Sequence, residues 1–237
     1  MYYINVNSIV KYFTCPVKLT FDDDNTDMGL GKIKSYIFSG LLDYCFYLKV
    51  VNQPVSLVKL NGELNYLWSK IKKESTACAS LHDKMYIKNK LYEFTSLFES
   101  VNSTIYYDVP RVISIGEINL SYSFYSNLKE GQVESIIKFY PEDNHVNDKD
   151  IALRIISSLI KEDLDNFDDG LDHQVLLFNS KNGKIIACKT LDKLKTSTVY
   201  KSLERNLNEK YFLPRNSKNV CRECNFKTIC EWNSLDG

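Results

Sequence analysis

The stretch Cys221-Arg-Glu-Cys-Asn-Phe-Lys-Thr-Ile-Cys230 places three thiols within ten residues near the end of the chain. A structural site for a soft metal needs a fourth ligand. The opposite end of the chain supplies one at Cys15, directly before Pro16, where a predicted short helix capped by Asn7 or Ser8 must end. The sequence therefore predicts one metal site, which joins the two ends of the chain and consists of Cys15, Cys221, Cys224 and Cys230.

The spacing of these cysteines does not decide which metal they hold. Four thiolates in a tetrahedral arrangement suit zinc and a 4Fe-4S cluster equally, so both stay open on the residues alone. Closing a ring of about two hundred residues would remove about 5 kcal/mol of chain entropy from the unfolded state. The other cysteines lie among apolar or small residues and are expected to fill the core; they are Cys45, Cys78 and Cys188.

Composition favours one large soluble domain over residues 1–237. Lysine and arginine total 30, aspartate and glutamate total 30, and hydrophobic residues make up 44% of the chain. With no net charge, any contact with nucleic acid must come from a local basic patch. No apolar stretch reaches membrane-spanning length, and the first residues lack the order of a signal peptide. We expect a cytoplasmic protein without a membrane partner, whose cysteines stay reduced.

The pattern of apolar residues predicts an α/β fold. Helical spacing between residues 31 and 100 predicts a helical lobe, and β-branched and aromatic runs from 102 to 208 predict a sheet core. The expected elements of that core are strands 105–115, 117–125 and 132–140 with a turn at 127–131, helix 151–160, strands 174–178 and 185–188, and helix 194–207. A mixed sheet follows, with the lobe inserted before it and the metal site at residue 15 plus 221–230.

Taken together, these features resemble a known family. Ser8, Tyr12 and Cys15-Pro16 at the start, and Cys-x2-Cys-x5-Cys at the end, enclose helix, meander and helix. The arrangement resembles the iron-sulfur members of the PD-(D/E)XK nuclease superfamily: RecB-like exonucleases, the CRISPR-associated exonuclease of spacer acquisition, and the nuclease domain of AddB. The resemblance implies a restriction-endonuclease-like mixed sheet and favours a 4Fe-4S cluster over Zn²⁺ on the four cysteines.

The same resemblance implies where catalytic residues would stand. The family uses a helix histidine, Gly-x-Ile-Asp, Asp-Tyr-Lys and Gln-x-x-x-Tyr to hold a divalent cation and direct a bound water at the phosphodiester. In this chain the corresponding slots hold other residue types, namely Ser35, Asn119, Lys138, Tyr140, Asp150 and Arg154. Lys138 falls on a carboxylate slot, where its ammonium, at about 4 Å and an effective dielectric of about 20, would repel the cation by about 8 kcal/mol. These slots predict a nuclease-like fold without a hydrolytic centre.

A local basic run predicts contact with DNA. Residues 184–218 contain nine lysines or arginines against three acidic residues, interleaved with Tyr200, Tyr211 and Phe212, which offer rings to stack on bases. A solvated helix face is the alternative reading of such a run. The side chains that we expect to face DNA are Lys193, Lys195, Lys201, Arg205, Lys210 and Arg215.

Three functions stay open on the sequence. The first is a non-catalytic subunit that binds DNA, a protein partner or both, within a recombination, replication, mobile-element or CRISPR-type assembly. The second is an active metal-dependent deoxyribonuclease with relocated acidic ligands among Glu117, Glu134, Glu142 and Asp143. The third is a zinc-stapled protein-interaction or transcription-associated module that does not contact nucleic acid.

Overall fold

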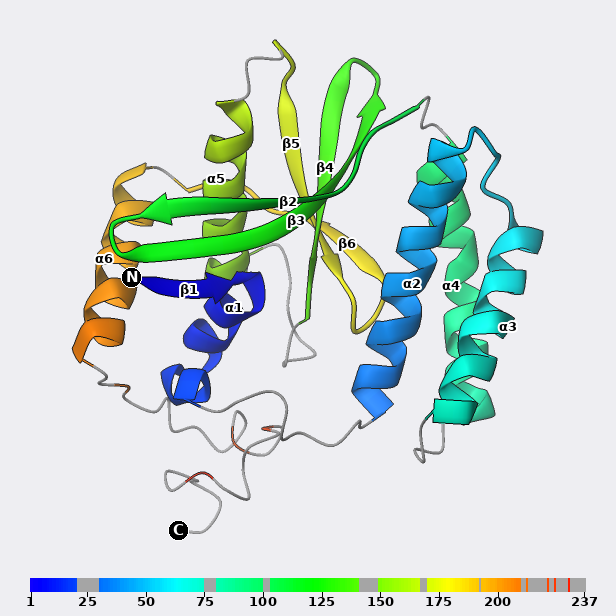
Figure 1. Cartoon of the computed structure of the whole chain (residues 1–237), viewed down its shortest axis with the longest axis horizontal. Helices are drawn as coiled ribbons and strands as arrows, with labels where there is room; N and C mark the ends of the chain where they lie inside the picture. Colours follow the sequence, from blue (N-terminus) through cyan, green and yellow to red (C-terminus); the bar gives the residue numbers. More distant parts are fainter. Residues whose placement is uncertain are drawn as a thin grey trace.

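The computed structural model describes residues 1–20, 30–74, 80–99, 103–140, 149–166, 170–191 and 193–209, together with residues 212, 221, 224 and 230. The helices are α1 (Val6–Thr14), the short 3-10 helix η1 (Pro16–Thr20), α2 (Leu30–Val50), α3 (Leu57–Glu74), α4 (Leu81–Glu99), α5 (Ile151–Asp165) and α6 (Lys193–Glu209). The strands are β1 (Tyr2–Asn5), β2 (Ser103–Ile115), β3 (Ile118–Lys129), β4 (Gln132–Phe139), β5 (His173–Asn179) and β6 (Lys184–Ala187). Figure 1 shows a mixed α/β protein built on one six-stranded mixed sheet.

The sheet follows the order β1-β3-β4-β5-β6, and β2 pairs with β3. The predicted meander of β2, β3 and β4 is confirmed, since both of its pairs are antiparallel. β5 lies parallel to β4 after the crossover through α5, and β6 returns antiparallel. β1 adds a short parallel pair with the first residues of β3. The sequence analysis missed β1, because a strand of four residues is too short to show a clear alternation.

The turn between β3 and β4 fixes the register of the central strands. Glu130 and Gly131 have φ angles of 52° and 83°, and Lys129 pairs directly with Gln132. Two successive residues with positive φ make the two-residue hairpin turn whose twist matches the strands on either side. β3 therefore runs to Lys129, and the expected turn over 127–131 is wrong about where the turn begins.

Strand β2 forms one edge of the sheet and is irregular in its first half. Its register against β3 shifts between Thr104 and Tyr106 and again between Tyr106 and Val109. Asp108, inside the second shift, has a φ of 46°, and Pro110 follows it. Bulges and a proline are tolerated at an edge, where no further strand needs the missing donors.

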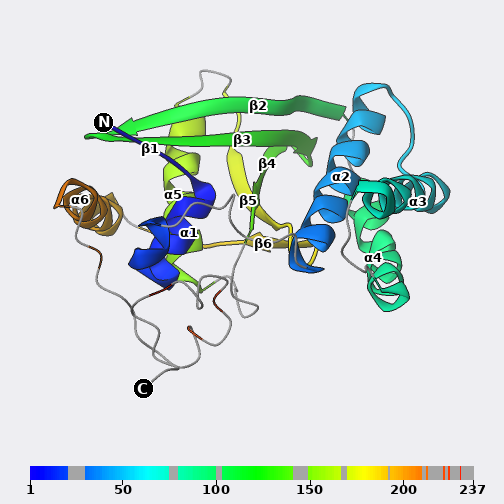
Figure 2. The same ribbon diagram turned by 60° about the horizontal axis from the view of Figure 1, so that its bottom comes forward.

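Helices cover both faces of the sheet. Phe124 and Ile137 pack with α1 and α5, whereas their chain neighbours Tyr125 and Ile136 pack with α2 and α4. This split follows from the strand period of two. Figures 1 and 2 show α1, α5 and α6 together at one end of the sheet and α2, α3 and α4 at the other.

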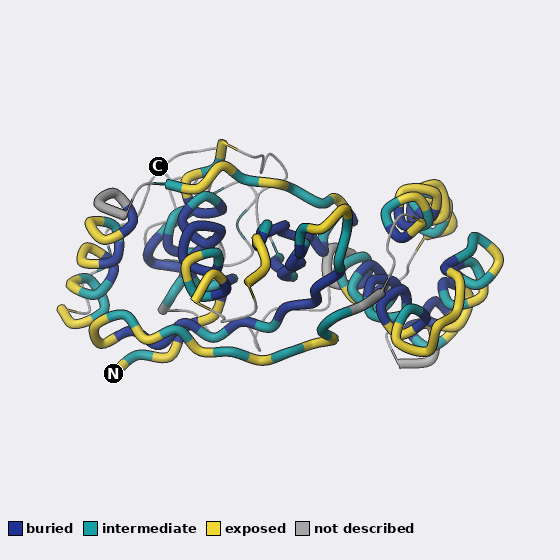
Figure 3. Tube along the Cα trace, turned by 90° about the horizontal axis from the view of Figure 1, so that it is seen from above, coloured by how far each residue is buried: buried dark blue, intermediate teal, exposed yellow. Residues whose placement is uncertain are grey.

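The region predicted to be helical forms α2, α3 and α4, which we call the helical lobe. In Figure 3 the buried residues of these helices face one another and the sheet, while their outer surfaces are exposed. Helix α1 begins at Val6 with Asn5 as its N-cap, and Ser8 completes a capping box. The expected cap at Asn7 or Ser8 was therefore placed too late. None of the helices in the described ranges has the length and apolarity that a membrane span requires.

Candidate functional site

The register separates two positions that the family resemblance would bring together. Phe124 pairs with Ile137, so the next position along both strands sets Ser123 beside Lys138. Asn119 lies four residues earlier on β3, about 13 Å away at the usual rise per residue. It is buried there and accepts a hydrogen bond from the Ser114 hydroxyl at 2.7 Å. Asn119 therefore does not lie beside Lys138 on the neighbouring strand, where Ser123 stands, and its assignment to the first carboxylate slot stays a prediction.

Lys138 is held by a carboxylate from the helical lobe. Its Nζ donates to Oδ1 of Asp43 on α2 at 2.8 Å, and the Tyr125 hydroxyl donates to the same oxygen at 2.8 Å. The ammonium also lies 4.8 Å from the centroid of the Tyr125 ring. Burial, and then the Asp43 carboxylate, raise the pKa of Tyr125 far above its ordinary value, so its hydroxyl remains a donor. The sequence analysis missed Asp43, because no local pattern links it to a lysine 95 residues away.

A cleft of about 470 Å³ opens beside Lys138. It forms where β1 and β4 pair with different parts of β3, which leaves Tyr122 and Ser123 between them. The polar side chains that line it are Asn5, Asn7, Arg111, Ser121, Ser123 and Lys138. Lys138 is paired with Asp43 and Arg111 with Asp163 on α5, but none of the described residues lining the cleft itself carries a carboxylate. Such a lining suits an anion such as a phosphate, whereas a magnesium ion prefers carboxylate ligands.

The other slot residues have separate structural partners. The Ser35 hydroxyl donates to the Ser180 hydroxyl at 2.8 Å. Asp150 is the N-cap of α5, and Arg154 Nε donates to a backbone carbonyl at 3.1 Å. The Tyr140 backbone N–H donates to Asn7 Oδ1 at 2.7 Å and so closes one side of the cleft. In these contacts the four residues stabilise the fold.

Glu117 and Glu134, two of the four proposed relocated ligands, do not form one site. Glu117 precedes β3, whereas Glu134 on β4 pairs with Asn127 near the other end of β3. Ten residues of strand separate the two positions, about 30 Å at the usual rise. The expectation that Glu117 and Glu134 share a metal ion is therefore wrong. Glu142 and Asp143 lie outside the described residues.

The four cysteines of the predicted metal site are all among the described residues. Cys15 ends α1, and its N–H donates to the Lys11 carbonyl at 2.8 Å. The N–H of Cys224 donates to the Cys221 carbonyl at 3.2 Å, a turn that sets the two cysteines of a Cys-x-x-Cys pair close together. None of the four is in a disulfide. Across the described positions, however, no three histidine, cysteine or acidic side chains lie close enough to hold a metal ion. Thiolates are suitable ligands for a soft metal, and the prediction that these four cysteines come together around one stays a prediction.

One hydrogen bond does tie the two ends of the chain together. Asn206 Nδ2 on α6 donates to the Tyr12 hydroxyl on α1 at 2.7 Å, across 194 residues. Tyr12 belongs to the motif that ends at Cys15, and α6 is the last described helix before Cys221. The helix that leads into the first cysteine thus contacts the helix that precedes the other three.

The basic run is only partly described. Lys201 and Arg205 lie one turn apart on α6, and both are exposed. Lys193 and Lys195 belong to α6, but their side chains are outside the described part, as are Lys210 and Arg215 altogether. The suggestion that Tyr200 stacks on a base is wrong, because Tyr200 is buried in the core under α6.

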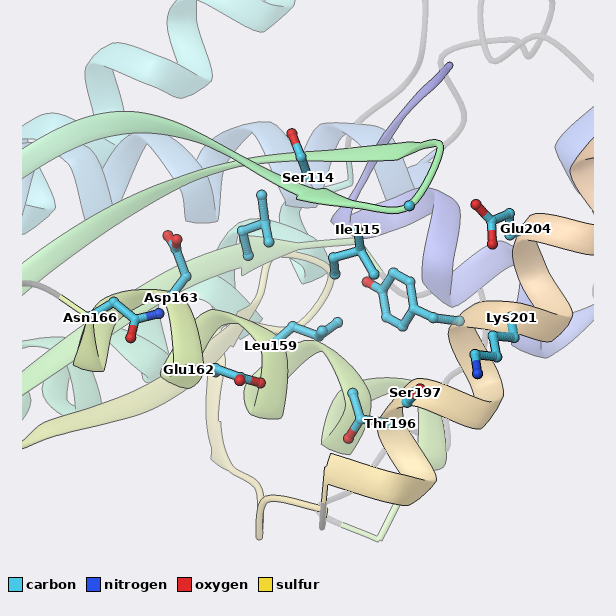
Figure 4. Close-up of a pocket in the computed structure, with 13 residues that line it drawn as sticks. Ser114, Ile115, Leu159, Glu162, Asp163, Asn166, Thr196, Ser197, Lys201 and Glu204 are labelled. Atoms are coloured by element: carbon cyan, nitrogen blue, oxygen red, sulfur yellow. The ribbon is translucent and has the colours of Figure 1, made fainter.

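A second cavity, of about 520 Å³, lies under α6 (Figure 4). Ile115 from the end of β2, Leu159 from α5 and Thr196 from α6 are among the side chains around it. Glu204 closes one end, since its Oε1 accepts from the Glu117 N–H at 2.7 Å. The Tyr200 hydroxyl is buried without a hydrogen-bond partner among the described residues. The cavity separates α6 from the sheet, and its lining also includes the charged side chains of Glu162, Asp163, Lys201 and Glu204.

Comparisons with known proteins add little. No family model matches the chain, and no curated protein matches it. Among solved structures, one described as "Crystal structure of SSO0001" aligns with 95% of this chain and 95% of its own, at 12% sequence identity and a TM-score of 0.33. A TM-score this low supports no statement about function.

Proposed function

We propose that this chain is a non-catalytic, nuclease-like protein that binds DNA through the cleft beside Lys138, as a subunit of a DNA-processing assembly. The observation that carries the proposal is the lining of that cleft, in which Lys138 stands among neutral polar side chains without a carboxylate, while Arg111 is paired with Asp163 on α5. A nuclease of this kind needs acidic groups to hold its cation. A lining of donors can still bind the phosphodiester that such an enzyme would cleave.

The geometry around Lys138 supports binding rather than hydrolysis. Asp43 and Lys138 are both roughly a third exposed and 2.8 Å apart. An ion pair this accessible to water contributes only about 0.2–1 kcal/mol, so a phosphate can compete for the ammonium at small cost. The hydroxyl of Ser123 and the side-chain amides of Asn5 and Asn7 supply further donors for phosphate oxygens, while the Ser121 hydroxyl donates to the Ile4 carbonyl at 3.2 Å.

The kinship with iron-sulfur nucleases and the metal site are parts of the same proposal. Cys15, Cys221, Cys224 and Cys230 would hold the 4Fe-4S cluster, or Zn²⁺ as the alternative, and the metal would fasten the two ends of the chain. The bond between Tyr12 and Asn206 supports this, because it already joins the helices that lead to both sets of cysteines. Metal analysis and the visible spectrum of anaerobically purified protein test it: a cluster gives a brown protein with four irons, zinc a colourless one with one zinc.

DNA binding is tested by fluorescence anisotropy with labelled single- and double-stranded oligonucleotides at several salt concentrations. We expect Lys138→Ala to weaken binding about threefold to tenfold and to lower the salt slope by about one, as for the loss of one phosphate contact. Lys88→Ala, which removes the same charge from the exposed surface of α4, is the matched control and should leave the affinity unchanged. Equal effects of the two variants, or no salt-dependent binding at all, would contradict the proposal.

Asp43→Asn gives the opposite expectation. Removing the carboxylate that holds Lys138 frees its ammonium for phosphate, so DNA affinity should rise severalfold while Lys138→Ala lowers it. Incubation with Mg²⁺ or Mn²⁺ should leave both oligonucleotides intact. Cleavage that is lost in Asp43→Asn would instead identify an active nuclease that uses this carboxylate.

A further inference from the structure

We propose that the groove between α3 and α4 is a docking site for an amphipathic helix of a partner protein, with acidic residues beside its apolar stripe. The groove measures about 380 Å³ and lies in the helical lobe. Its lining comprises Leu57, Val58, Asn61, Lys88, Asn89, Leu91 and Tyr92. The proposal concerns a different surface from the DNA cleft and does not depend on DNA binding.

The first support is an unusual exposure of large apolar side chains. Val58 on α3 is 83% exposed and Tyr92 on α4 is 70% exposed, and both line the groove. Met85, two turns before Tyr92 on α4, is 57% exposed. Single exposed apolar residues are common, but Val58 and Tyr92 line one hollow, and exposed apolar side chains that share a hollow indicate an interaction surface. A bound partner would remove these apolar side chains from water.

The second support is the shape of the surface. The groove brings residues 57–61 of α3 beside residues 88–92 of α4, and Lys84 Nζ donates to Asn65 Oδ1 at 2.6 Å. Earlier residues of one helix therefore face later residues of the other, which makes the two helices antiparallel. Two antiparallel helices leave a trough along their shared side, into which the side chains of a third helix pack. The opposite side of the pair is already filled by α2, which packs against both helices.

Charge selects the kind of helix that fits. Lys88 is the only charged side chain among the described residues that line the groove. Lys84 lies one turn away on the same helix, 5.9 Å from the Trp68 ring centroid. Glutamates or aspartates on a partner helix would meet these lysines with opposite charge. A second copy of this chain would bring a second Lys88 and no acidic lining residue to the contact, so the charge complementarity would be missing.

The position of the groove permits simultaneous binding of DNA. α3 and α4 lie at one end of the molecule and α6 at the other (Figures 1 and 2). The DNA cleft is lined by residues of β1 to β4 and the start of α1, none of which lines the groove. A partner helix on the lobe would therefore add a protein contact without covering Lys138.

The test is a selection from a yeast-displayed library of 20-residue helical peptides, sorted against the full chain. We expect the enriched peptides to carry bulky apolar residues at helical spacing with aspartate or glutamate beside them. Binding of an enriched peptide should weaken at least tenfold in Tyr92→Asp and in Val58→Asp, and about threefold in Lys88→Glu. It should be unchanged in Ile151→Asp, which places the same charge on an exposed apolar residue of α5, and in Lys138→Ala.

Three results would overturn the proposal. The first is a selection that enriches no peptide, or one that enriches lysine and arginine in place of the acids. The second is enriched peptides that bind the groove variants as tightly as the original chain. The third is a dimer, seen by light scattering, that Tyr92→Asp dissociates, since this face would then bind a second copy. Thermal melts of each variant establish that these exposed substitutions leave the fold intact.

Discussion

Replacing Asp163 with alanine should destabilise the protein more than any other surface carboxylate on its helix. Asp163 on α5 accepts hydrogen bonds from Arg111 Nε at 2.7 Å and Arg111 Nη2 at 3.2 Å. It also accepts from the Tyr122 hydroxyl at 2.7 Å. Arg111 belongs to β2 and Tyr122 to β3, so one carboxylate joins α5 to two strands. The side chains of Arg111 and Asp163 are 30% and 17% exposed, and Tyr122 is buried.

The size of the effect follows from these contacts. Losing the acceptor of a buried hydroxyl costs about 1–3 kcal/mol, here that of Tyr122. Breaking a fully buried ion pair costs about 3–5 kcal/mol, but partial exposure of Arg111 to water reduces this to about 1–2 kcal/mol. We therefore expect Asp163→Ala to lower the free energy of unfolding by about 3 kcal/mol. For a domain of this size that corresponds to roughly 6–12 °C in Tm.

Urea denaturation followed by circular dichroism, with calorimetry for Tm, measures this loss. The matched control is Asp165→Ala on the same helix, whose carboxylate is 3.4 Å from Lys161 Nζ and largely exposed. That change should cost less than about 0.5 kcal/mol. The double variant Arg111→Met with Asp163→Leu should be more stable than Asp163→Leu alone, because it leaves no unpaired cation. Equal losses in Asp163→Ala and Asp165→Ala would refute the reasoning.

Three further predictions concern stability. Hydrogen bonds from Lys34 and Ser80 hold the pKa of Asp83 below its ordinary value. The ionised carboxylate therefore contributes to the free energy of unfolding above about pH 4, and this contribution is lost as the pH falls through the folded-state pKa. Asp83→Asn should thus cost about 1 kcal/mol at pH 7 and almost nothing at pH 2, as measured by denaturation at both pH values. Tyr200→Phe should raise stability by about 1 kcal/mol, because it removes a buried hydroxyl without a partner; a loss in the melt would mean that the cavity holds an acceptor. Gly131→Ala should cost about 1 kcal/mol at its φ of 83°, whereas Gly62→Ala, inside α3 with open space around it, should be neutral or stabilising in the same melts.

The central sheet was predictable because its strands carry a strong local signal. The meander of β2, β3 and β4 and the helix that follows arise from β-branched runs and helical spacing that any short window contains. The register was not predictable in the same way. It depends on the left-handed conformations of Glu130 and Gly131, and the sequence analysis placed the turn too early.

The candidate site was predictable only for residues that a local sequence pattern could locate. Lys138 was assigned to a degenerate carboxylate slot through the family resemblance, and the structure places it at the edge of a cleft. Asp43 was missed, because a contact between a helix and a strand 95 residues apart leaves no periodic trace. Tyr200 was misread for a related reason. Its helix has a basic sequence, yet the side of α6 that carries Tyr200 packs into the core.

The contacts of the first residues bear on how the chain folds during synthesis. β1 can pair only after β3 has been synthesised, more than a hundred residues later, and Tyr12 can bond only after Asn206 has been synthesised. At about 5–20 residues per second, ribosomes need roughly 10–40 s to make the intervening stretch. The nascent amino-terminal segment thus spends that time without its final neighbours, and such distant pairing slows folding. The native contacts of α1 are therefore complete only once α6 has been synthesised.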